Sequence, residues 1–224
     1  MQQMQFYKKE KIAQDSWQFW FVKPEEFLLQ AGQYITLFLH EDNRDFTVCM
    51  DLDNKNYFSI VTKKGKSEFK KNLFSLQPNR VLQISEPLGG FVLNKNNKLP
   101  KVFLAGGIGI TPFYSMIYSN KNTSIPLTLF ASFSKKENVI FYNELQNIQR
   151  ENKNIRIIYT LSQEKWDGEE GRISEKLVKK YVPNIQSTEF MIAGGEQMVY
   201  DTEKMLLQMK VPQEKIRVDI FTGY

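Results

Sequence analysis

The hydrophobic pattern in the first half of the chain is typical of β-strands. Short runs rich in β-branched and aromatic residues alternate with polar turns such as "HEDNRD" and "LDNKN". The expected strands are residues 17–23, 33–40, 45–50, 56–63 and 80–86. Only residues 67–76 have helical spacing, and the apolar side of that helix carries Phe69, Leu73, Phe74 and Leu76. Many short strands with a single helix predict a small antiparallel barrel.

The second half alternates between strand patterns and helix patterns, beginning after a polar stretch at residues 94–101. The expected strands are 102–105, 126–133, 155–162, 189–195 and 216–221, and the expected helices start at Thr111 and cover 138–152, 174–182 and 196–210. This alternation predicts a parallel sheet covered by helices. We therefore expect an antiparallel β-barrel domain over residues 1–98 and an α/β domain over residues 99–224.

The composition narrows the class of protein. It is 42% hydrophobic and 25% charged, as in ordinary globular domains. No apolar run approaches the roughly 18–20 residues that span a bilayer, and the first residues contain no apolar signal segment. We expect a cytoplasmic protein. The net charge of +5 favours phosphates or an acidic protein partner, and no nucleic-acid-binding motif accompanies the lysine clusters.

The counts of cysteine and histidine exclude several chemistries. Cys49 is the only cysteine, so the chain supplies no disulfide, iron–sulfur cluster or thiolate zinc site. His40 is the only histidine, which argues against a His-rich metal site or a His-based triad. We expect Cys49 to be a small buried filler and His40 to be structural. Demanding chemistry would have to come from a bound cofactor.

A glycine-rich turn follows the apolar run "KVFLA". Gly106, Gly107 and Gly109 permit positive φ and leave room beside the backbone. Thr111 is a suitable N-cap, and Pro112 suits the first helical position, although a Rossmann fingerprint would have glycine there. A strand, an open turn and a helix N-terminus can bind a phosphate or a flat ring. The alternative is a turn required only for packing.

A second candidate site lies in the barrel half. Gly65, Lys66 and Ser67 stand between an expected strand and a helix start, which is another phosphate-binding arrangement. Ile60 occupies the position where a Walker A loop needs glycine, so that motif is excluded. An exposed basic loop is the alternative.

The third candidate is the segment "RDFT". Arg44 can pair with a pyrophosphate, Phe46 can lie against a planar ring, and the Thr47 hydroxyl can hydrogen-bond a ring nitrogen. Strand alternation puts Arg44 and Phe46 on one face and Thr47 on the other unless the strand bends.

Taken in chain order, these features resemble the ferredoxin–NADP reductase superfamily. Its pattern is R-x-[YF]-[ST] on a barrel strand, a G-x-S phosphate loop and then G-G-x-G-x-T-P. This chain has "RDFT", "GKS" and "GGIGITP" in that order. The segments "PEEFLLQAGQY", "EEGRIS" and "IRVDIFTGY" extend the likeness over nearly the whole chain. The resemblance implies an FAD-binding barrel followed by an NAD(P)-binding domain.

The resemblance also implies roles for individual residues. Arg44 would hold the FAD pyrophosphate, Phe46 would stack on the isoalloxazine, and Thr47 would lie near its N5. Thr47 and Asp219 are the expected catalytic residues, with a surface carboxylate as the alternative for Asp219. The FAD site would comprise Arg44, Phe46, Thr47, Val61, Lys63, Gly65, Lys66, Ser67 and Tyr224. The nicotinamide nucleotide site would comprise Gly106, Gly107, Gly109, Thr111, Ser132, Arg172, Gly194 and Met198.

The implied reaction is hydride transfer from NAD(P)H to the flavin, followed by single-electron steps to an acceptor. The first hypothesis is a separate redox partner, such as a ferredoxin, flavodoxin, cytochrome or oxygenase component. The second is reduction of a small acceptor, such as free flavin, a ferric chelate or a quinone.

A third hypothesis is a non-catalytic flavin-binding module, because the segment "IAGGEQM" has Ala193 where many relatives have the Cys of C-G-P. Either NADH or NADPH could be the donor. Ser134 stands at the position where NADP-selective relatives often have Arg, which favours NADH.

Overall fold

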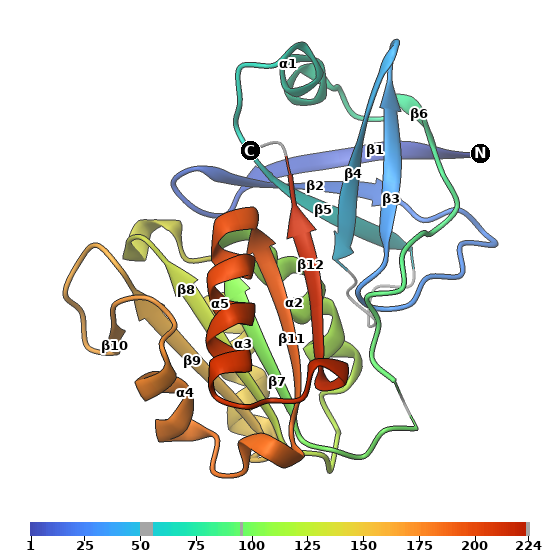
Figure 1. Ribbon diagram of the computed structural model, residues 1–224. Helices are drawn as coiled ribbons and strands as arrows, with labels where there is room; N and C mark the ends of the chain where they lie inside the picture. The colour runs from blue at the N-terminus through green and yellow to red at the C-terminus, as the bar shows by residue number, and fades with distance from the viewer. Residues whose placement is uncertain (50–55, 95, 223–224) are drawn as a thin grey trace.

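The first half of the chain forms a closed antiparallel barrel (Figure 1). The computed structural model describes residues 1–49, 56–94 and 96–222. Within these residues the barrel order is β1-β2-β5-β4-β3-β6, and β6 pairs with β1 to close it. The strands are β1 (Gln2–Lys11), β2 (Ser16–Val22), β3 (Tyr34–Leu39), β4 (Asp42–Cys49), β5 (Tyr57–Lys63) and β6 (Val81–Ile84). The predicted barrel is confirmed.

Strand β1 is the barrel element that the hydrophobic pattern did not predict. Met4 and Phe6 lie in the barrel core, but the second half of the strand is lysine-rich. Lys9 is tolerated because its Nζ donates to the carbonyl oxygen of Phe74 at the end of the neighbouring helix. The lysines therefore hid the strand pattern of β1, although this strand is needed to close the barrel.

The helix of the barrel half is α1 (Glu68–Ser75), close to the predicted 67–76. Ser67 is its N-cap, and the Ser67 hydroxyl accepts the backbone N–H of Lys70 at 3.3 Å. Phe69 and Leu73 point into the barrel core. The helix thereby brings its first turn against strands β4 and β5.

The second half forms a parallel sheet in the order β10-β9-β8-β7-β11-β12. Its strands are β7 (Lys101–Gly106), β8 (Leu127–Phe133), β9 (Ile155–Leu161), β10 (Glu169–Glu170), β11 (Glu189–Gly195) and β12 (Ile216–Phe221). The helices are α2 (Ile110–Ser119), α3 (Tyr142–Glu151), α4 (Glu175–Tyr181) and α5 (Glu196–Gln208). The predicted α/β domain is confirmed, whereas the two-residue β10 was not expected.

Helices cover both faces of this sheet because its side chains alternate between them. Phe103 and Ala105 share a core with α2 and α3, whereas Val102 and Leu104 share one with α4 and α5. The chain order of the strands reverses between β7 and β11, a point where open α/β sheets bind ligands. In the described residues, no helix is both long and apolar enough to cross a membrane.

Two helix starts differ from the prediction. Helix α2 begins at Ile110 after a 3-10 turn, so Thr111 is not the N-cap; its hydroxyl instead donates to the carbonyl oxygen of Ile108 at 3.0 Å. Pro112 therefore lies in the first turn of the helix, where backbone N–H groups make no hydrogen bond within the helix, so the proline costs no such bond. Helix α3 begins at Tyr142 instead of residue 138, because Phe141 has a φ of +59°.

The barrel and the sheet domain make direct contacts. The Ser115 hydroxyl on α2 donates to the carbonyl oxygen of Val48 on β4 at 2.9 Å. Arg217 on β12 donates to the carbonyl oxygens of Gly90 and, at 2.6 Å, Val92. The predicted boundary at residue 98 falls between β6 and β7.

Candidate active site

A cavity of about 460 Å³ lies where the barrel meets the carboxyl end of β12 and the start of α2. Figure 1 shows β12 running toward the barrel. Predicted site residues from both domains line this cavity: Arg44, Phe46, Thr47, Val61, Ser67, Thr111 and Asp219. The wall also contains residues that the sequence did not single out: Tyr34, Asn43, Asp45, Thr62, Lys70, Ile108, Ile220, Phe221 and Thr222.

The "RDFT" segment reaches the cavity with all three of its predicted side chains. Phe46 is buried, and its ring stacks on that of Phe69 at 5.9 Å between centroids. Arg44 is exposed, pairs with Asp42, and lies 5.5 Å from the Phe69 ring. Although alternation turns Thr47 away from Phe46, Thr47 still lines the cavity.

Lys70 is the most informative residue that the sequence did not predict. Its Nζ donates to the Thr62 hydroxyl and lies 5.5 Å from the centre of the Phe46 ring. Burial, and then the charge of Arg44, lowers the pKa of Lys70 to about 8. The signal available in the sequence was its position three residues after the Ser67 cap, on the first turn of the helix.

The rest of the expected phosphate loop lies outside the cavity. Gly65 and Lys66 are exposed. Lys63 forms a salt bridge with Asp15 at 2.8 Å. Partial burial alone would raise the pKa of Asp15, but the hydrogen bond from Lys63 lowers it below its ordinary value. Of the loop residues, only Ser67 lines the cavity wall.

The glycine turn after β7 serves packing as well as access. A Cβ on Gly109 would lie 2.2 Å from the carbonyl oxygen of Ala193, so this glycine lets the turn pack against β11. Gly107 has a φ of +54°, and a Cβ added there would meet no atom within 4 Å. Glycine is therefore favoured at this position by the left-handed backbone conformation and not by close packing. Packing therefore explains Gly109, whereas a binding role for the turn stays a prediction.

The remaining nucleotide-site residues cluster at the carboxyl ends of the strands, with one exception. Gly106 and Gly194 both lie against the Met198 side chain, and Ser132 stands beside Gly106 on β8. Arg172 is the exception, on the loop between β10 and α4. Tyr224 lies outside the described residues.

Asp219 is the carboxylate that the second domain contributes to the cavity. It lies beside Ala193 in the register of β11 and β12. Burial raises its pKa, which keeps a proton available on this wall at a higher pH than an exposed aspartate would. Cys49 is fully buried, as expected, and burial raises the pKa of its thiol far from reactivity.

Comparisons with known proteins agree with this arrangement. Residues 103–204 match the oxidoreductase NAD-binding domain family. Ferredoxin–NADP reductase B of Sorangium cellulosum is 25% identical over 208 residues, which cover 86% of this chain and 85% of that protein. A ferredoxin NADP⁺ reductase from Neisseria gonorrhoeae, solved with bound FAD and NADP, superposes with a TM-score of 0.84 at 20% identity over 98% of each chain. The chain is therefore similar to ferredoxin–NADP reductases over nearly its whole length.

These likenesses are to NAD(P)H oxidoreductases of the ferredoxin reductase type. A third relative is the glycine betaine monooxygenase reductase subunit of Chromohalobacter salexigens, which is 26% identical over 82% of this chain and 55% of that protein. The chain spans about half the length of several other curated relatives that it matches, including 57% and 52% of two flavohemoproteins.

The cavity residues of this chain fit a flavin dinucleotide. Arg44 and Lys70 offer two cations for a diphosphate, and Phe46 offers an aromatic ring for a planar group. Val61 and Ile108 add apolar surface to the wall. A cofactor with a flat ring and a diphosphate would match this combination of side chains.

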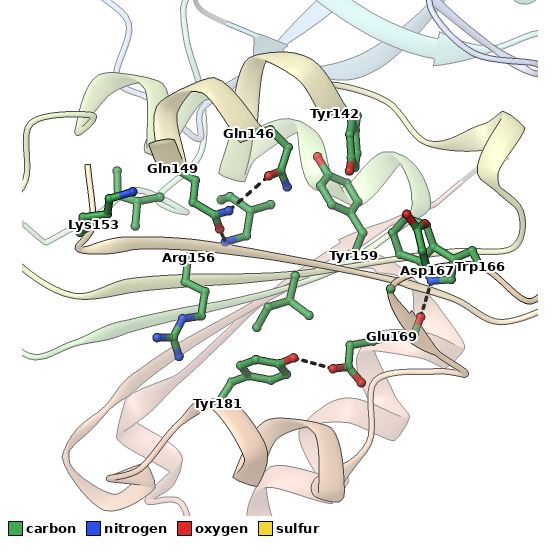
Figure 2. A pocket seen from close by; sticks show the side chains of 14 residues that line it. Tyr142, Gln146, Gln149, Lys153, Arg156, Tyr159, Trp166, Asp167, Glu169 and Tyr181 are labelled. Atoms are coloured by element: carbon green, nitrogen blue, oxygen red, sulfur yellow. Dashed lines mark hydrogen bonds between the residues drawn. The ribbon is translucent and has the colours of Figure 1, made fainter. Parts of the chain in front are cut away.

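A larger hollow of about 650 Å³ lies elsewhere, along the outer edge of β9 between α3 and α4. Figure 2 shows Tyr159 and Tyr142 on one side of β9, and Tyr181 donating to Glu169 on the other. The outward N–H of Ile157 is already bound by Gln149 at 2.5 Å. None of the predicted site residues lines this hollow, so size alone does not identify the active site.

Proposed function

We propose that this protein transfers hydride from NAD(P)H to FAD held in the cavity between its domains, and passes the electrons to a separate acceptor protein. A ferredoxin, a flavodoxin, a cytochrome or an oxygenase component is the class of acceptor. The observation that carries the proposal is the single cavity lined by Arg44, Phe46 and Thr47 from the barrel and by Thr111 and Asp219 from the sheet domain. FAD, when bound, supplies the change from two-electron to one-electron chemistry.

The barrel side would hold and orient the cofactor. Arg44 binds the diphosphate, Phe46 supports the ring system, and the Thr47 hydroxyl donates a hydrogen bond to the reacting edge. Val61 and Ser67 complete this side, whereas Lys63, Gly65 and Lys66 lie outside the cavity.

The sheet side would position the donor. Gly106, Gly107, Gly194 and Met198 lie at the carboxyl ends of β7 and β11, where the strand order reverses. Gly107 leaves its backbone open to a nucleotide, and Ser132 and Arg172 are further contacts. Asp219 is the carboxyl on this wall that would exchange a proton during turnover, and burial raises its pKa.

The acceptor assignment is supported by the relatives named for ferredoxin and for a monooxygenase. The net charge of +5 favours an acidic partner through long-range attraction. The cytoplasmic location expected from the sequence stays a prediction.

A stopped-flow experiment tests the acceptor. The protein is loaded with FAD, reduced anaerobically with one equivalent of NADH, and mixed with an acidic ferredoxin, free FMN or a ferric chelate. We expect the ferredoxin to reoxidise the flavin fastest, with a rate that falls as salt rises. Faster reoxidation by free FMN or ferric chelate would instead identify a reductase of small acceptors.

A further inference from the structure

The cavity wall contains a second cation beside the predicted one. Lys70 and Arg44 both line the cavity, from α1 and β4 respectively. Each side chain contacts one ring of a stacked pair: Lys70 Nζ is 5.5 Å from the centre of the Phe46 ring, and the Arg44 guanidinium is 5.5 Å from that of Phe69. Aromatic faces attract cations and hold both at this wall.

This arrangement is unfavourable for the protein without an anion. Burial and the charge of Arg44 both disfavour the ammonium form of Lys70. Arg44 has Asp42 as its partner, but among the described residues no carboxylate lies within 4 Å of Lys70 Nζ. Asp45 and Asp219 line the same cavity without pairing with Lys70. A group with several negative oxygens would satisfy both cations at once.

We propose that Lys70 joins Arg44 in binding the diphosphate of FAD. This inference rests on the proposed assignment of the cavity as the flavin site. The loop expected to take this role is placed differently, because Gly65 and Lys66 are exposed and do not line the cavity. The Ser67 hydroxyl already accepts the N–H of Lys70 as a helix cap. The charge of the diphosphate would therefore be met by side chains rather than by an open glycine loop.

The test compares flavins that do and do not carry a diphosphate. Dissociation constants of the apo-protein for FAD and for riboflavin are measured by quenching of flavin fluorescence. The variants are Lys70→Met, Lys70→Arg and Arg44→Met, with Lys71→Met as the matched control. Lys71 lies on the same helix, is exposed and pairs with Glu68 at 3.2 Å, so its loss removes the same charge away from the cavity.

We expect Lys70→Met to raise the Kd for FAD about 10- to 100-fold while leaving the Kd for riboflavin unchanged, because a charge-assisted contact is lost. Lys70→Arg should restore most of the affinity, and Lys71→Met should behave as wild type. Unchanged FAD binding in Lys70→Met, or an equal loss for FAD and riboflavin, overturns the inference. If Arg44→Met also binds FAD normally, the proposed flavin site itself is wrong.

Thermal unfolding of the apo-variants separates binding from folding. Removing a desolvated ammonium should leave the Tm of Lys70→Met equal to or above that of wild type. A Tm well below wild type would mean that Lys70 supports the fold, and would count against a role in binding.

Discussion

Lys70 and Asp219 face the same cavity, and burial shifts the pKa of each toward its neutral form. Burial removes water from around an ammonium and a carboxylate, and this disfavours the charged form of each. Such a wall strengthens interactions with a bound ionic group, because the same low dielectric acts on both partners. At the residue scale the site is therefore prepared for a charged ligand at the Lys70 end and for proton exchange at the Asp219 end.

The affinity for FAD should depend on pH through Lys70. Its pKa of about 8 in the free protein is expected to rise when a diphosphate binds, so binding takes up a proton above pH 8. Affinity should then fall by up to about tenfold per pH unit above pH 8. Arg44, Asp45 and Asp219 are the other charged groups on the wall. Fluorescence titrations from pH 6.5 to 9.5 check this, and a flat profile in Lys70→Met is the control.

Asp219→Asn should stabilise the protein at neutral pH and slow its reduction by NADH. Burial raises the folded-state pKa of Asp219 above the ordinary 3.8, so the folded state holds its proton longer than the unfolded state. The free energy of unfolding of the wild type therefore falls as pH rises from 3.8 to the folded-state pKa of Asp219. The variant should not show this decrease. Melting curves between pH 4 and 8 measure it. Parallel curves for the two proteins would contradict the assignment.

At the scale of elements, short runs rich in β-branched and aromatic residues were the part of the barrel that the sequence could predict. The strands around Phe19, Ile35 and Ile60 were found in this way, and these residues fill the barrel core. Strand β1 was missed because its lysines project from a strand that pairs on both edges. The start of α3 was missed because Val139 and Ile140 are apolar at helical spacing, while the positive φ at Phe141 is a tertiary effect.

The site was only partly predictable for a related reason. Motif spacing located Arg44, Phe46 and Thr47, because adjacent positions on one strand stay together in the fold. Lys70 could not be separated from its exposed neighbours by sequence alone, since only the packing of α1 against β4 and β5 buries it.

The glycine turn gives a prediction at this scale. Gly109→Ala should lower the free energy of unfolding by about 3 kcal/mol or more, because its Cβ would overlap the backbone of β11. Gly107→Ala is the matched control; its Cβ meets nothing, so only the left-handed conformation is penalised, by about 1–2 kcal/mol. Urea denaturation of both variants checks the order. A larger loss for Gly107→Ala would show that the close approach to β11 is not the constraint.

At the scale of the whole molecule, the two domains must hold a fixed relative position, because each forms one wall of the cavity. Ser115 ties α2 to β4, and Arg217 ties β12 to the segment after β6 through two carbonyl oxygens. At the far end of the sheet, Lys101 and Glu189 form a buried ion pair at 2.6 Å. The side-chain amide of Asn97, on the segment between the domains, also donates a hydrogen bond to Glu189. These contacts fix the barrel wall relative to the carboxyl ends of the strands.

Breaking the buried pair should weaken the whole molecule. Glu189→Ala leaves Lys101 buried without its partner and should lower the free energy of unfolding by about 3–5 kcal/mol. The exposed pair of Lys71 and Glu68 provides the control, because Glu68→Ala should cost about 0–1 kcal/mol. Denaturant unfolding compares them. Equal losses would mean that the buried pair contributes no more than a surface contact.

The most direct test of the central claim is anaerobic titration of the FAD-loaded protein with NADH and, separately, with NADPH. Absorbance of the flavin band near ~450 nm reports its redox state. Bleaching by at least one nucleotide at near one equivalent is the predicted result, and the tighter titration identifies the donor. A bound flavin that neither nucleotide reduces would contradict the claim, and would indicate that the chain with Ala193 in place of the family cysteine binds flavin without hydride transfer.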